Sequence, residues 1–190
     1  MKKACFLSIV LILVLFFGFT GCYNAKNNNY SIDMSDINNR MIYNKITNSV
    51  NKEYLKDVFA DDVESHYQEL VLPENVDKIK ASLLEDNFII ECCKEKGVFV
   101  SQDLTKKYAM IEFDDLNKDN SQKKYSQFLE TTLAEFQLSK NEYLELLYQE
   151  AYYKYNRNAL KKYFNENLYE DSVKLTLDEQ FDEYIKALKK

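Results

Sequence analysis

The single histidine of the chain and its nearest carboxylate are the first residues that could do chemistry. His66 follows Asp62 by four positions, which would place both side chains on one face of a helix, where two metal ligands could meet. No second histidine is present, and Val63 stands where a Glu-x-x-His pair would need its carboxylate. We therefore expect a solvated pair of His66 with Asp62 and no metal site.

Other catalytic patterns are equally sparse. Glu112, Asp114 and Asp115 gather carboxylates, but they lack the alternate spacing of a calcium loop, so a solvated helix end is expected. The chain has no Gly-x-Ser-x-Gly turn for a nucleophilic serine. With 3 glycines in 190 residues, it also lacks a glycine-rich phosphate-binding loop. The sequence therefore predicts neither an enzyme nor a resident cofactor.

Two cysteines stand side by side at Cys92 and Cys93. Neighbouring side chains on a helix point about 100° apart, so a disulfide between them would strain the backbone. One interpretation is a redox or metal-binding pair. The alternative, which we expect, is two small apolar residues near the end of a helix.

The N-terminus carries an export pattern. Lys2 and Lys3 precede an uncharged apolar stretch, 4–21, which ends in Phe19-Thr20-Gly21-Cys22. This pattern predicts a lipoprotein signal peptide over 1–21 and lipidation of Cys22 by diacylglycerol and an acyl chain such as palmitate, although Phe19 departs from the usual aliphatic residue. A retained transmembrane helix is the alternative. Either interpretation places the remaining chain at the extracytoplasmic face of a bacterial cell membrane.

The amino-acid composition indicates how the chain after the export pattern is organised and which partners it could bind. Residues 22–34 are rich in asparagine without periodicity, so we expect a lipidated tether there and a helical domain over 35–190. Acidic residues outnumber basic ones by 31 to 25, which argues against a nucleic-acid partner. Lysine far outnumbers arginine, a bias typical of AT-rich genomes and suggestive of a Gram-positive bacterium.

The elements that must position any site are helices. Apolar residues recur at spacings of three to five positions, and 3 glycines with 1 proline are too few turn residues for most all-β folds. We therefore expect an all-α fold. The expected helices span about 35–62, 73–96, 101–116, 123–136, 139–165 and 177–188.

Local signals mark several helix ends. Gly97 follows Lys94 and Lys96 and is expected to cap a helix in the left-handed conformation. Capping boxes start at Ser139, with Glu142, and at Thr176, with Glu179. Leu138 and Tyr143 flank the first box as an expected hydrophobic staple. These signals separate the helices independently of their apolar pattern.

Two segments resemble a known family. Residues 91–101, ECCKEKGVFVS, are similar to a helix-to-helix junction of SurA/PrsA-type chaperone domains, with Cys93 where that family has a small alanine. Residues 136–144, FQLSKNEYL, resemble the start of the long helix of the same domain, and the order of elements over 73–190 also matches, with a weaker match from Ser35. Two features depart from the family. No opening strand precedes Ser35, and the stretch between Phe164 and Thr176 is too short for a parvulin domain. The resemblance therefore implies a chaperone-like, peptide-holding module without prolyl isomerase activity.

A module that holds unfolded or secreted polypeptides needs exposed apolar surface. Tyr148, Tyr152 and Tyr153 crowd one stretch of helix and are the expected peptide-binding residues, since a tyrosine ring is apolar while its hydroxyl stays wet. Helical spacing predicts that Tyr148 and Tyr152 flank the core face and that Tyr153 lies farthest from it. That core face is expected to comprise Leu144, Leu147, Ala151 and Tyr155.

A dedicated interaction or scaffold lipoprotein of an envelope or spore complex is the alternative function. The shape of the exposed apolar surface separates the two hypotheses. A broad aromatic groove favours general holding, whereas a flat patch on one helix favours a fixed partner.

Overall fold

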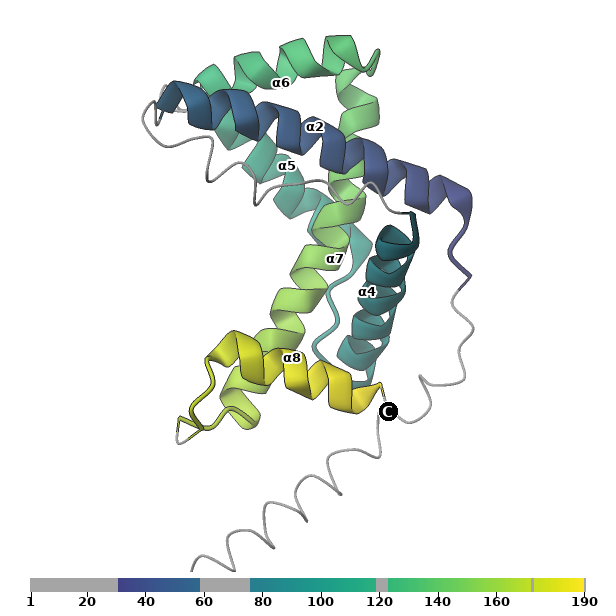
Figure 1. Cartoon of the computed structure of the whole chain (residues 1–190), viewed down its shortest axis with the longest axis vertical. Helices are drawn as coiled ribbons and strands as arrows, with labels where there is room; N and C mark the ends of the chain where they lie inside the picture. Colours follow the sequence, from purple (N-terminus) through teal and green to yellow (C-terminus); the bar gives the residue numbers. More distant parts are fainter. Residues whose placement is uncertain (1–30, 59–75, 119–122, 172, 190) are drawn as a thin grey trace, which may run out of the picture. The chain divides into compact units, whose positions relative to one another are not determined.

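The computed structural model describes residues 31–58, 76–118, 123–171 and 173–189, and within these ranges it contains helices and no strand (Figure 1). This confirms the predicted all-α class. The predicted signal peptide, Cys22, Asp62 and His66 lie outside the described residues. The helices are α2 (Met34–Val58), α4 (Val76–Lys96), α5 (Gln102–Lys118), α6 (Lys123–Glu135), α7 (Lys140–Asn167) and α8 (Leu177–Leu188).

Helix length and hydropathy also bear on membrane insertion. Across the described ranges, every helix is too short or too polar to cross a bilayer.

The described chain divides into two compact units. The α8 unit contains Asp86–Phe99 and the residues from Asn156 onward, which include α8. The α2 unit contains Ser31–Glu85 and Val100–Tyr155. Helices α4 and α7 each contribute one part to each unit, so each unit is described by its own core.

The α8 unit has one apolar core. Its α8 helix begins at the Thr176 capping box and buries one face, including Phe181 and Ile185. The ring of Phe181 lies 5.8 Å from that of Phe164 in α7. The buried residues of this core are Phe88, Ile89, Cys92, Cys93, Leu160, Phe164, Phe181, Ile185 and Leu188.

The α2 unit has two apolar clusters. In the larger one, α2 packs along α6 and is joined by residues of α5 and α7. Its buried residues are Ile46, Val50, Phe113, Leu129, Leu133 and Tyr143. The smaller cluster joins α2 to α4 through Ile37, Ile79 and Leu83. Helix α2 therefore buries different faces along its length, which explains why its apolar residues do not form one stripe.

Two helices end in the same hydrogen-bonded cap. Gly97 has φ +71°, its N–H donates to Lys94 O, and the N–H of Val98 donates to Cys93 O at 2.9 Å. This pair of bonds is a Schellman cap, and it confirms the predicted end of α4. The end of α6 repeats the cap with Gln137 at φ +55°, where the sequence offered no glycine to indicate it.

The two predicted capping boxes are present. The backbone N–H of Ser139 donates to Glu142 Oε2 at 2.7 Å, and the N–H of Glu142 donates back to Ser139 Oγ. Thr176 and Glu179 make the same reciprocal bonds at the start of α8. Tyr143 is buried in the larger cluster of the α2 unit, and Leu138 packs against that cluster, as expected for a staple.

Candidate functional site

The adjacent cysteines belong to the core of the α8 unit. Cys92 and Cys93 are both 0% exposed and form no disulfide. Cys93 Sγ donates to the carbonyl oxygen of Asn156 at 3.2 Å. Their burial confirms the interpretation of two small core residues and leaves neither thiol accessible from solvent.

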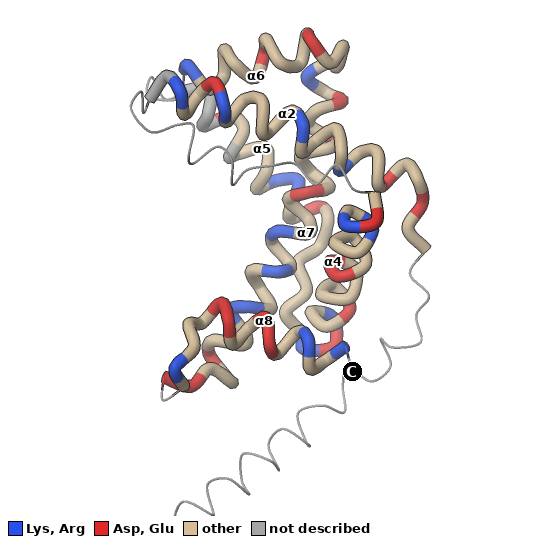
Figure 2. The backbone as a smooth tube through the Cα atoms, viewed as in Figure 1, with Lys and Arg blue, Asp and Glu red and all other residues tan. Residues whose placement is uncertain are grey.

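Carboxylates do not gather into a site among the described residues. Within the described ranges, no group of three His, Cys, Asp or Glu side chains is placed to hold a metal ion. Asp114 is exposed, as expected for a solvated helix end, while the side chains of Glu112 and Asp115 lie outside the described part. Figure 2 shows acidic and basic residues interspersed along the helices.

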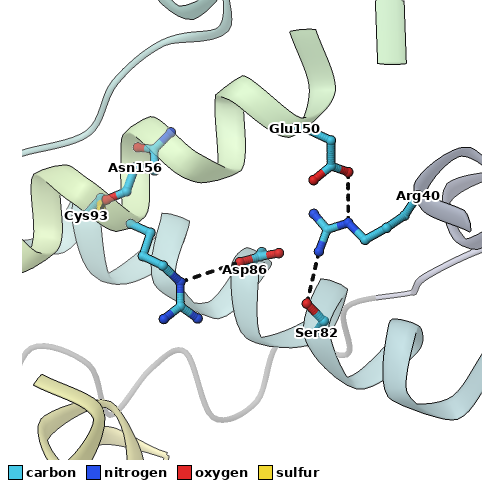
Figure 3. A network of polar contacts seen from close by, with 7 residues as sticks. Arg40, Ser82, Asp86, Cys93, Glu150 and Asn156 are labelled. Atoms are coloured by element: carbon cyan, nitrogen blue, oxygen red, sulfur yellow. Dashed lines mark hydrogen bonds and ion pairs between the residues drawn. The ribbon is translucent and has the colours of Figure 1, made fainter. Parts of the chain in front are cut away.

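A buried arginine organises the polar interior of the α2 unit. Figure 3 shows Arg40 of α2 reaching both Glu150 of α7 and Ser82 of α4. Its Nε lies 2.8 Å from Glu150 Oε1, and its guanidinium lies 4.8 Å from the centre of the Tyr153 ring. Because each of these groups already has a partner, we interpret this network as structural rather than as an empty binding site.

A second ion pair belongs to the α8 unit alone. Arg157 Nε of α7 lies 4.0 Å from Asp86 Oδ1 of α4. The Asp86 side chain is 10% exposed, and that of Arg157 is 35% exposed. This pair lies beside the apolar core and is interpreted as structural as well.

The three predicted tyrosines are all half-buried, but they have different surroundings. Tyr153 packs against the small cluster that contains Ile37, Ile79 and Leu83. The prediction that Tyr153 lies farthest from a core is therefore wrong. It assumed one buried face on α7, whereas α2 and α4 cover a second one. Burial also raises the pKa of Tyr153.

Tyr148 lies at the edge of a shallow hollow. The hollow has a volume of about 370 Å³ and is lined by Asn141, Glu142, Leu144, Glu145 and Tyr148. Partial burial, with the nearby charges of Glu145 and Asp114, raises the pKa of Tyr148. Lys106 Nζ lies 5.6 Å from the ring centre, a cation–π distance. Tyr152 contacts Tyr153, with ring centres 5.9 Å apart.

A second hollow lies between α2 and α6. It has a volume of about 570 Å³ and is lined by Asn48, Ser49, Lys52, Glu53, Phe128, Thr131, Thr132 and Glu135. Its charged groups are of both signs, and its rim is open. Such an arrangement offers little to select one small molecule.

The main exposed apolar feature is a stripe on α5 that the sequence analysis missed. Leu104, Tyr108 and Ile111 are 40%, 40% and 49% exposed, and their spacing of four and then three positions places them on one helix face. The buried face of α5 instead carries Thr105, Ala109 and Phe113. We call Leu104, Tyr108 and Ile111 the apolar stripe.

Aromatic contacts connect the apolar stripe to α7. The Tyr108 ring lies 5.5 Å from that of Tyr155, and Lys154 Nζ lies 5.9 Å from the Tyr155 ring centre. Tyr155 was expected in the core face of α7, but it is half-buried at the border of the stripe. Apolar residues on two faces of 102–118 were the signal in the sequence that could have indicated this surface.

Comparison of the chain with protein-family models, with curated proteins and with solved structures gives no match. A function therefore has to be argued from the residues of the chain itself.

Proposed function

We propose that the chain is a lipid-anchored extracytoplasmic protein whose helical module docks a dedicated polypeptide partner. The observation that carries this proposal is the apolar stripe, three large side chains that remain between 40% and 49% exposed on one face of α5. An ordered stripe of this kind on a protein surface is typical of a site that another polypeptide covers. No enzymatic activity is proposed.

The dimensions of the stripe favour a fixed partner over general holding. It occupies two turns of one helix rather than a broad groove, so it offers few alternative ways to bind unrelated chains. Covering these side chains would contribute about 25 cal/mol for each Å² of apolar surface removed from water, before the costs of association. This contribution suits one well-matched segment within a larger interface.

Chaperone-like holding of secreted proteins is the second candidate. It is supported by the resemblance of 91–101 and 136–144 to SurA/PrsA-type domains and by the half-buried Tyr148 and Tyr152. A holding module would bind many unfolded chains weakly.

Site-specific crosslinking in living cells tests the two candidates. A photoreactive residue is placed at Leu104 or Ile111 of the full chain, and a matched control is placed at Met110, which is 51% exposed on another face of α5. One discrete crosslinked protein from Leu104 and Ile111, absent from Met110, is expected for a dedicated partner. Many unrelated secreted proteins would support holding instead, and equal products from all three positions would contradict a role for the stripe.

The proposed anchor has its own test. Cys22→Ser should leave an unprocessed precursor without a thioether-linked lipid, because the modified cysteine defines the cleavage site. Mass spectrometry of the mature wild-type protein should find diacylglycerol on Cys22. A cleaved but unlipidated mature protein would overturn the lipoprotein assignment.

A further inference from the structure

We draw no further inference here: the strongest candidate, the apolar stripe on α5, already carries the proposed function, and the exposed charges beside it on Asp103, Lys107 and Asp114 are of both signs, so nothing in the structure shows the chemistry of what covers it.

Discussion

Arg40 Nε and Glu150 Oε1 lie 2.8 Å apart in an ion pair that joins α2 to α7 inside the α2 unit. Their side chains are 8% and 17% exposed, so neither is fully hydrated in the folded protein. The Arg40 guanidinium also contacts Ser82 and the face of Tyr153. A single side chain thus connects three helices, and losing its charge would leave Glu150 without its main counter-ion.

The stability of the Arg40 variants should follow from that desolvation. Arg40→Met should lower the free energy of unfolding by about 2–3 kcal/mol, because Glu150 would remain charged and largely buried. Arg40→Met with Glu150→Met should recover most of the loss, since no unpaired charge remains. Urea denaturation followed by circular dichroism measures both values. A double variant as unstable as Arg40→Met would show that packing, not charge, dominates at this site.

Gly97 and Gln137 occupy the same position in two matching helix caps. Replacing glycine at the first position and introducing it at the second should therefore change the free energy of unfolding in opposite directions. A Cβ at Gly97 meets nothing within 4 Å, so Gly97→Ala should cost about 1 kcal/mol through the left-handed backbone alone. Gln137→Gly should raise the free energy of unfolding by about 0.5 kcal/mol, because it relieves the same strain at φ +55°. Gln127→Gly, in the exposed interior of α6, is the control and should lower stability by about 1 kcal/mol. A loss of stability in Gln137→Gly would contradict this account of the α6 cap.

The capping boxes predict a dependence of stability on acid pH. Hydrogen bonds from Ser139 lower the pKa of Glu142 below its ordinary 4.5, and hydrogen bonds from Thr176 lower that of Glu179 in the same way. A carboxylate whose pKa is lower when folded contributes stability above its unfolded pKa and loses it as the pH falls through the folded pKa. NMR titration should find both pKa values below 4.5. Ser139→Ala should return only the Glu142 pKa towards its ordinary value and reduce the loss of stability on acidification.

Local signals account for what the sequence predicted well. Gly97, the Ser139 box and the Thr176 box act within one helix turn, so their partners are readable a few residues away. The Gln137 cap escaped prediction because glutamine rarely takes the left-handed conformation. The burial of Tyr153 and the exposure of Ile111 depend on which helices meet, and that information is spread along the whole chain. Periodicity finds an apolar face on a helix but does not say which of two faces a neighbour covers.

The last prediction concerns the tyrosines of α7. Because these tyrosines have different surroundings, their variants can distinguish an effect on client binding from an effect on the free energy of unfolding. Tyr153 packs in the small cluster beneath Arg40, so Tyr153→Ala should lower the free energy of unfolding by about 2–3 kcal/mol, below the cost for a fully buried aromatic residue. Tyr148 and Tyr152 were predicted from the sequence to bind peptide, and Tyr148 lies at the rim of an open hollow. Tyr148→Ala with Tyr152→Ala should therefore cost less stability than Tyr153→Ala. Under the second candidate function, chaperone-like holding, the same double variant should also reduce suppression of aggregation of an unfolded model protein by the full chain.

Both variants are compared at equal fractions of folded protein, as determined by denaturation. Aggregation of the client is followed by light scattering without ATP. If the chain does not delay aggregation of several clients even in molar excess, general holding is excluded, and the two tyrosines lose their predicted role. If Tyr153→Ala instead abolishes holding with no loss of stability, the cluster with Ile37 and Leu83 must open to admit the client, and the assignment of Tyr153 to the core would be wrong.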